Sequence, residues 1–549
     1  MVGKKGVWFM ALLLAVAMVV TSCAPAGPKL ANVINLDHGT EPPSLDPNLS
    51  TDTTSVQCVA LFFMGLTIND VKTMETKPWL ATEYSVSADG LTWTFKMRRD
   101  VNWVHYDPAT KKTERKRPVT AHDIVYSVKR ALNPETASDY AYVLYILQNA
   151  IEVNSGESSD LDSVGVKATD DYTVQFTLTQ PAGYFPNIAG LWTANPVPKE
   201  AIEAHGDKWT EPGNIWTCGP YVLDTWEHES KMVMKKNTLW YNASTVTIET
   251  INWTMVTEES TRFAMYENGE LDVCAVPVAD IDRVKADAKL SKELYIAPYL
   301  CTYYYGFNTA KAPTDNVKVR QALSHGIDRQ KLIDTVLKAE QKPAKTFACP
   351  GIFGSPAEDA SFVGISYDPA KGKALLAEAG YPDGKGLPEI TLMFNTSQGH
   401  QKIAEFIQQS WKEALGIEVK LANQEWAVYL KTVKDDAPQV YRMGWCADYT
   451  DENNWVLEVF HPTLSANDPN WSGPDADKFG QLTEQAAAET DPAKRKQLYF
   501  EAEKLLCVDS AVIAPIYYYT RVVCTKPYVE RSYSALGGEQ IWGWKVQAH

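Results

Sequence analysis

The sequence lacks the motifs that most often mark an enzyme. It has no Gly-x-Ser-x-Gly nucleophile elbow and no His-Glu-x-x-His zinc helix, and residues 380–385 have the wrong spacing for a phosphate-binding loop. Its 9 histidines form no pair at helical spacing, and its 9 cysteines form no Cys-x-x-Cys or Cys/His pattern. We therefore expect no metal, no cofactor and no catalytic residue, with a secreted peptide hydrolase as the alternative.

The chain also has little that would bind nucleic acid or span a membrane. It carries 52 Lys and Arg against 68 Asp and Glu, a net charge of −16, whereas nucleic-acid binding depends on clustered cations. The one basic run, Lys111–Arg117, is short and is expected to form a solvated loop. After residue 22 no apolar run reaches the ~20 residues that a spanning helix needs.

Residues 1–22 are predicted to be an export signal, because Lys4 and Lys5 precede the apolar run Val7–Val20. The end of this segment, Val-Thr-Ser-Cys23, resembles the bacterial lipobox, which implies cleavage before Cys23 and attachment of lipid to it. The alternative is an ordinary signal peptide followed by a chance cysteine. Residues 23–30 would then form a tether, and the mature chain would be anchored at the outer face of the cell membrane.

Length and composition point to a large protein with a recognition surface. At 549 residues, the chain is long enough for about three or four structural units of roughly 100 to 200 residues each. It contains 17 Trp and 27 Tyr, side chains that line ligand sites as well as cores. An exported protein can form disulfides, but spacing alone does not pair the cysteines.

The most regular pattern predicts a βαβ unit. Alternating apolar residues predict strands near 390–394 and 417–421, and apolar residues at helical spacing predict a helix between them, closed by Gly416. Ligands bind at the carboxyl ends of such parallel strands. His400 follows the first strand, Trp426 follows the second, and Arg442–Asp448 is expected to add another strand and its exit loop.

Asp448 lies in the segment Gly-Trp-Cys-Ala-Asp-Tyr, among large aromatic residues. Burying an unpaired carboxylate costs several kcal/mol, roughly, so an aspartate in such company needs a partner. That partner is either a bound cation or, on the structural alternative, a nearby arginine or a helix N-terminus.

Together these segments resemble the extracytoplasmic oligopeptide-binding proteins of bacterial ABC importers, of the peptide/nickel type (solute-binding protein family 5). The resemblance covers essentially the whole mature chain and is most specific at these segments: Glu41–Pro47, Pro118–Asp123, Cys301–Tyr305, Val317–Leu323, Asn395–Ser397, Asn423–Trp426, Gly444–Tyr449 and Pro515–Tyr519. It implies an α/β fold, a bilobed periplasmic-binding-protein type II fold with an additional inserted domain. Domain I would comprise residues 31–67, 200–300 and 520–549, domain II residues 68–199, and domain III residues 301–519.

The resemblance also implies a function and a site. The lipoprotein would be a monomer. It would capture an oligopeptide between its lobes and deliver this peptide to the membrane permease of an ABC importer. Asp448 would pair with the peptide's ammonium group, backbone near Gly444 and Cys446 would bond the peptide, and Arg442 or His400 would meet its carboxylate. The implied pocket residues are Trp426, Tyr304, Tyr140 and Tyr519, for each of which core packing is the alternative, and the implied disulfide joins Cys301 to Cys446.

Two departures from the family pattern bear on ligand preference. Gly306 stands where close family members carry a glutamate in the charged part of the site, and residues 105–117 form an insertion. We therefore expect the far end of the groove to differ in charge or in the peptide lengths it accepts. A pairing of Cys507 with Cys524 is a further hypothesis. Rival functions are the same fold binding a saccharide, haem or a metal chelate, or a lipoprotein that senses peptides without importing them.

Overall fold

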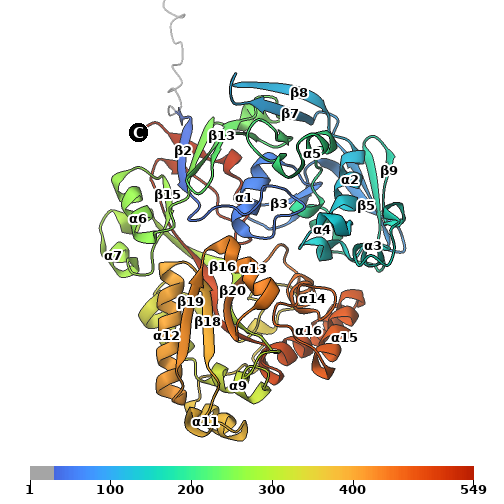
Figure 1. Cartoon of the computed structure of the whole chain (residues 1–549). Coiled ribbons are helices and arrows are strands. Elements are labelled where there is room, and N and C mark those ends of the chain that lie inside the picture. The colour runs from blue at the N-terminus through green and yellow to red at the C-terminus, as the bar shows by residue number, and fades with distance from the viewer. Residues whose placement is uncertain (1–29) are drawn as a thin grey trace, which may run out of the picture.

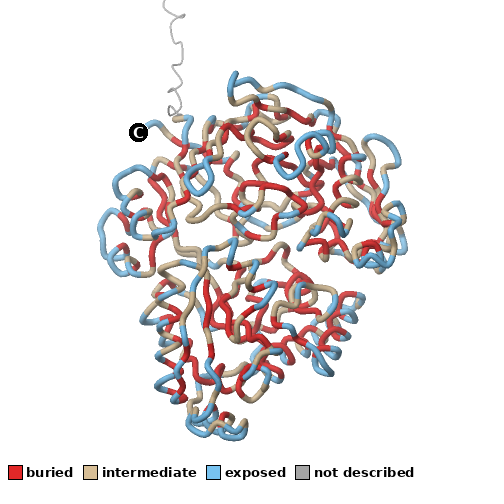
Figure 2. The backbone as a smooth tube through the Cα atoms, viewed as in Figure 1, coloured by how far each residue is buried: buried red, intermediate tan, exposed pale blue. Residues whose placement is uncertain are grey.

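The computed structural model describes residues 30–549, which form two lobes (Figure 1). The predicted signal peptide and the lipid-bearing Cys23 lie outside the described residues. The first lobe contains most of the chain before β16 (Leu294–Phe307) and the C-terminal segment, and the second lobe contains most of the chain between β16 and β21 (Ile513–Thr525). Figure 2 shows buried residues gathered inside each lobe, with exposed residues on the outer loops and helix faces. No helix among residues 30–549 is long and apolar enough to cross a membrane.

The first lobe is built from small sheets around one continuous hydrophobic core. The alternation of Trp93, Phe95 and Met97 places all three side chains in that core. A capping box of Thr120 and Asp123 is present at the start of α2 (Ala121–Leu132). Three of its sheets are β12 (Tyr221–Glu227), β13 (Lys231–Lys236), β14 (Thr250–Thr254) and β2 (Val33–Asp37); β5 (Ala81–Val86), β6 (Thr92–Met97), β10 (Thr173–Thr177) and β9 (Val166–Asp170); and β1 (Leu30–Ala31), β23 (Lys545–Gln547) and β22 (Val529–Glu530).

The insertion at 105–117 forms most of a hairpin, not a loop. Strands β7 (Asn102–Asp107) and β8 (Lys112–Pro118) pair antiparallel, so the prediction of a solvated loop for Lys111–Arg117 is wrong. Two of its basic side chains, Lys111 and Arg117, pair with residues outside the run. Lys111 pairs with Asp224 at 2.8 Å, and Arg117 pairs with Asp123 at 2.8 Å and with Glu200 at 2.6 Å.

The second lobe contains the predicted βαβ unit. Strands β18 (Ile390–Asn395) and β19 (Val419–Gln424) are parallel and are joined by α12 (Gln398–Leu415), which ends at Gly416 in the left-handed conformation. The predicted third strand, β20 (Val440–Cys446), lies parallel to β18. The surrounding helices include α9 (Val317–His325), α11 (Pro369–Glu378), α13 (Trp426–Asp436), α14 (Val456–Phe460), α15 (Pro474–Ala488) and α16 (Pro492–Lys504).

Two long antiparallel strands connect the lobes. β16 (Leu294–Phe307) and β21 (Ile513–Thr525) pair along most of their length, with a shift in register between Pro298 and Thr302. One end of the pair packs in a core with Phe263 and Tyr266, and the other end lies in the same sheet as β20 and β18, in the order β21-β16-β20-β18. The predicted domain boundaries near 300 and 519 fall within these strands, and the boundaries themselves stay a prediction.

The predicted disulfide is confirmed. Cys301 on β16 and Cys446 on β20 stand directly opposite each other and are bonded, with a Cα–Cα distance of 4.0 Å. The predicted Cys507–Cys524 pair is wrong, because these two residues lie in different hydrophobic clusters. Within residues 30–549 the other cysteines, Cys58, Cys218, Cys274, Cys349, Cys507 and Cys524, are buried and free.

Removing the disulfide is expected to destabilise the protein. It links residues 145 apart in sequence, and a cross-link of that span restricts the unfolded chain, so a Cys301→Ala/Cys446→Ala variant should lose about 2–5 kcal/mol of unfolding free energy. Urea unfolding followed by tryptophan fluorescence measures this. Cys274→Ala/Cys524→Ala is the matched control, because these free cysteines also stand opposite each other on β15 (Val273–Ala275) and β21. Equal losses in the two variants would contradict the expectation.

Candidate functional site

The outer edge of β20 is open beyond its first residues. β18 pairs with β20 only at Val440 and Tyr441, whereas β16 pairs along its full length on the other side. The backbone bonds of Ala447 to Leu300 and of Asn308 to Gln439 set the antiparallel alternation. That alternation turns the backbone N–H and C=O groups of Gly444 and Cys446 away from β16. This edge can therefore accept an additional extended chain.

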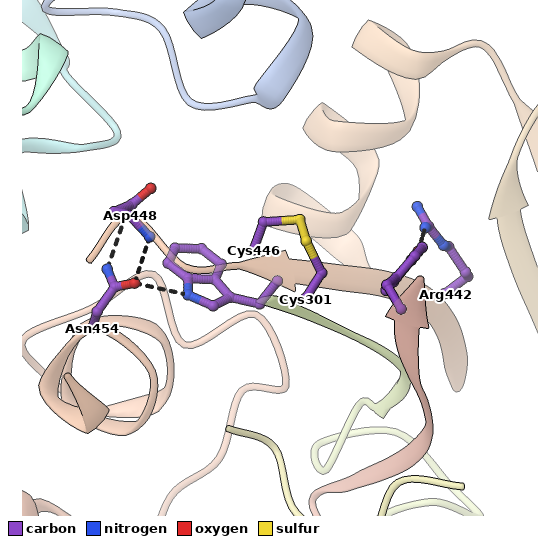
Figure 3. Close-up of a disulfide and its surroundings, with 7 residues drawn as sticks. Cys301, Arg442, Cys446, Asp448 and Asn454 are labelled. Carbon is purple, nitrogen blue, oxygen red and sulfur yellow. Dashed lines mark hydrogen bonds between the residues drawn. A yellow bond between two sulfur atoms is a disulfide. The ribbon is translucent and has the colours of Figure 1, made fainter. Parts of the chain in front are cut away.

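Asp448 lies just past one end of this open edge. Its Oδ2 accepts hydrogen bonds from the hydroxyl of Tyr140 at 2.8 Å and from Nδ2 of Asn454 at 2.9 Å, and its backbone N–H donates to Oδ1 of Asn454 at 2.9 Å. Its Oδ1 accepts no hydrogen bond from the described residues. Figure 3 shows one oxygen of this carboxylate directed away from Asn454, toward the ribbons of the first lobe. Within residues 30–549, neither an arginine nor a helix N-terminus neutralises it.

The protein environment disfavours the charge on Asp448. Burial raises its pKa to about 6, although hydrogen bonds from Asn454 and Tyr140 act in the opposite direction. Asn454 also donates to Oε2 of Glu458 at 2.8 Å. Burial raises the pKa of Glu458 to about 8, which favours its neutral form beside Asp448.

Arg442 lies on β20 on the opposite side of the disulfide from Asp448 (Figure 3). Its guanidinium donates to Oδ1 of Asn395 at 3.1 Å and to the hydroxyl of Tyr519 at 2.6 Å, and it lies 4.7 Å from the ring centroid of Tyr303. It forms no ion pair with any described carboxylate, and its Nε is buried without a partner. A buried guanidinium of this kind is suited to receive a carboxylate.

His400 is placed beside Arg442 but on a helix. It lies in the first turn of α12, where its Nδ1 is 3.4 Å from the Tyr303 hydroxyl. Burial, with the nearby charge of Arg442, lowers its pKa well below the ordinary value. His400 is therefore neutral and can offer a hydrogen bond to a ligand, but not a positive charge.

The four predicted pocket residues divide into two groups. Tyr140 bonds Asp448 across the two lobes, Tyr519 bonds Arg442, and the half-buried Trp426 stacks on Tyr429 at the start of α13. Tyr304 is directed to the face opposite Tyr303, because side chains alternate along a strand, but it packs in the core. The centroid of its ring lies 5.3 Å from that of Phe347 and 5.9 Å from that of Phe460. Core packing, the alternative to a role in a ligand pocket, therefore accounts for most of the contacts of Tyr304.

Sequence reasoning missed the residues that position the two charged groups. Asn454, which holds both the carboxylate and the N–H of Asp448, lies six residues along the chain in the turn Glu452–Asn454. The adjacent residues Asn453 and Asn454, shortly after Asp448, were the feature of the sequence that could have indicated this contact. Asn395 belongs to one of the segments that carry the family resemblance, but no contact was predicted for it. Its position at the end of β18 places its side chain within hydrogen-bonding distance of Arg442.

Gly306 is explained by its cross-strand neighbour. It stands opposite Tyr441 in the β16–β20 pair, and a Cβ atom at position 306 would lie 2.2 Å from the Tyr441 ring. Tyr441 thus fills the volume into which a side chain at 306 would project. The Tyr441 hydroxyl is buried and has no hydrogen-bond partner.

These features agree with what comparison with known proteins finds. Residues 75–467 match the family described as bacterial extracellular solute-binding proteins, family 5 middle region. The chain belongs to this family. The periplasmic oligopeptide-binding protein OppA of Escherichia coli is 35% identical over 529 residues, which is 95% of this chain and 93% of OppA.

Solved family 5 structures share the fold. Haemophilus influenzae OppA in complex with RPPGFSPFR matches with a TM-score of 0.85 at 28% identity, over 95% of this chain and 100% of that one. The E. coli murein tripeptide-binding protein MppA matches with a TM-score of 0.85 at 31% identity, over 95% and 99% of the two chains. Its unliganded open form, at 31% identity and over 96% and 99% of the chains, gives only 0.63. The lobes here are therefore arranged as in the first MppA structure and not as in the open form.

The buried charge of Asp448 should make the stability of this family 5 protein depend on pH. Its folded-state pKa of about 6 lies above the ordinary 3.8, so stability is lost as pH rises from ~4 to ~6 and stays reduced above that. Asp448→Asn removes this cost. We expect the unfolding free energy of the variant, relative to wild type, to rise by roughly 2–3 kcal/mol between pH 4 and pH 7. Urea unfolding at each pH measures this, and a difference independent of pH would contradict it.

Proposed function

We propose that this protein captures oligopeptides between its lobes outside the cytoplasm and delivers them to the permease of an ABC importer. One observation carries the proposal. An open strand edge at Gly444 and Cys446 has an unneutralised carboxylate, Asp448, past one end and an unneutralised guanidinium, Arg442, toward the other. An extended peptide with free termini supplies a backbone for the edge and a charge for each end.

This arrangement fixes the direction in which the peptide would run. Its ammonium group would pair with Oδ1 of Asp448, so its chain would continue antiparallel to β20 toward Arg442. The termini of a peptide carry opposite charges, and the reverse orientation would place like charges together at both ends. Residues 442 and 448 are six apart, which is about 20 Å along an extended strand. The side chains of Arg442 and Asp448 would both reach toward the ligand, so the distance between their charged groups would suit short peptides.

The contacts between the lobes support capture in a closed cleft. Tyr140 from the first lobe bonds Asp448, the ring of Tyr184 stacks on Tyr449 with centroids 5.7 Å apart, and Lys434 pairs with Asp139 across the cleft. Closure would exclude water and strengthen the charged contacts. A saccharide is a poorer candidate ligand, since a neutral sugar needs neither of the two opposite charges.

The rest of the assembly is proposed on the same basis. The relatives are named as periplasmic and oligopeptide-binding proteins, which supports a binding protein rather than a hydrolase. We include in the proposal the Cys23 lipid anchor, a monomeric state, and the division into domains I, II and III with boundaries near 67, 199, 300 and 519. The strands β16 and β21 would then act as the hinge.

Peptide binding with and without the amine charge tests the proposed function. Isothermal titration calorimetry should show that tri-alanine and tetra-alanine bind wild type, and that Asp448→Asn weakens binding at least 100-fold, because it removes the charge that meets the ammonium. N-acetylated peptides should bind weakly to wild type and lose little more in Asp448→Asn. Asp435→Asn, at an exposed carboxylate paired with Lys431, is the matched control. Equal binding of free and acetylated peptides by wild type would contradict the proposal.

Affinity for a free-amine peptide should fall in acid. The ammonium group favours the ionised form of Asp448, so binding must displace the proton that Asp448 carries below its pKa of about 6. The dissociation constant should therefore be constant above ~pH 7 and rise about ten-fold per pH unit below ~pH 6. Calorimetry from pH 5 to pH 8 at constant ionic strength measures this. The acetylated peptide, which does not need the charge, should show no such slope.

A further inference from the structure

Two helices from different lobes meet at their N-termini, beside the strands that connect the lobes. α6 (Glu259–Asn268) belongs to the first lobe and packs against β16 and β21, and α12 belongs to the second lobe (Figure 1). The first N–H groups of an α-helix have no partner within the helix, and the helix dipole places partial positive charge at that end. Two such ends repel each other unless a negative charge lies between them.

The carboxylate of Glu259 lies between these two helix ends. Glu259 is in the first turn of α6, and Ser397 is the N-cap residue of α12. The Oε1 atom of Glu259 accepts hydrogen bonds from the hydroxyl of Ser397 at 2.7 Å and from the backbone N–H of Gly399 at 3.1 Å. Within the described part of the chain Glu259 forms no ion pair, so the positive ends of the two helices offset its charge.

The contact between the two helices is reciprocal. Gln398, the first residue of α12, reaches back to α6, where its Oε1 atom accepts the backbone N–H of Ser260 at 3.2 Å. Glu258, the residue that precedes α6, gives this helix no side-chain cap. Each helix therefore has one of its first N–H groups bonded by a side chain from the other lobe. Both bonds require the lobes to be close together.

We infer that Glu259 and Gln398 form a latch that holds the two lobes together over a bound peptide. The inference rests on the proposed function and deepens it, because it names contacts that stabilise closure without touching the ligand. If the lobes moved apart, the Glu259 carboxylate would leave α12, and the first N–H groups of both helices would return to water. An interaction made only in the closed form shifts the equilibrium toward that form and slows release of the ligand.

Dissociation kinetics test the latch. Glu259→Gln keeps the size of the side chain and removes its charge. We expect tetra-alanine to dissociate from this variant about five-fold faster than from wild type, with an association rate within about two-fold, because the latch forms after the peptide has entered. Tetra-alanine amide should show the same ratio of dissociation rates, since the latch does not contact the carboxylate of the peptide. Stopped-flow tryptophan fluorescence measures both rates.

Further variants separate the latch from a general loss of stability. Glu259→Lys would place a positive charge between two positive helix ends and should speed dissociation more than Glu259→Gln does. Gln398→Ala removes the other half of the latch and should also speed dissociation. Glu258→Gln is the matched control, because this exposed carboxylate accepts a hydrogen bond at 3.0 Å from the Ser260 hydroxyl of its own helix. Its rates should equal those of wild type, and urea unfolding checks that each variant is folded.

The outcomes distinguish this inference from the proposed function. If wild type and Glu259→Gln release tetra-alanine at the same rate, the latch alone is overturned. An increase confined to the peptide with a free carboxylate would also overturn it, because Glu259 would then act on the ligand site through α12. If wild type binds no tetrapeptide, the proposed function is overturned, and small-angle X-ray scattering decides the latch. Ligand-free Glu259→Gln should then have a larger radius of gyration than wild type, and equal values would overturn the latch too.

Discussion

The arrangement of the site depends on the one-sided pairing of β20. Backbone groups of an extended strand alternate in direction, so a strand bonded on one edge presents half of its N–H and C=O groups on the other. β18 covers that other edge only at Val440 and Tyr441, and the Tyr429 hydroxyl bonds the Arg442 carbonyl at 2.5 Å. What remains is a short edge at Gly444 and Cys446. The two charged groups proposed to bind a ligand lie on either side of this edge, Arg442 on β20 itself and Asp448 just past its end.

The disulfide and the connecting strands make this edge rigid. Cys301 fixes Cys446 to the strand that crosses between the lobes, and β21 supports that strand from the other side. Tyr519 on β21 then bonds Arg442 on β20 across β16. The position of the guanidinium is consequently tied to the strands that would bend during closure, whereas the contacts of Asp448 reach the first lobe through Tyr140. Movement of the lobes would change the surroundings of the two charges differently.

Local patterns in the sequence predicted the elements but not the contacts between them. The period of two in Ile390–Phe394 and the helical spacing of 403–415 are direct consequences of burial, and they gave the βαβ unit correctly. The same period placed Tyr304 opposite Tyr303 but could not say that Phe347 and Phe460 cover that face. The bond from Tyr140 to Asp448 spans 308 residues, so only the closed tertiary structure reveals it. The basic run at 111–117 was misassigned for the same reason, since its partners come from distant segments.

Leaving charges unneutralised has a physical use in a protein that closes over its ligand. Asp448 and Arg442 each lack a counter-ion among residues 30–549, and desolvating such groups costs free energy when the lobes close. A ligand that supplies opposite charges at matching positions removes that cost. Because a ligand shifts an equilibrium only by its difference in affinity for the two states, the same charges would both select the ligand and favour the closed form. On this view the burial of Asp448 without a protein counter-ion both raises its pKa and favours a ligand that carries a positive charge.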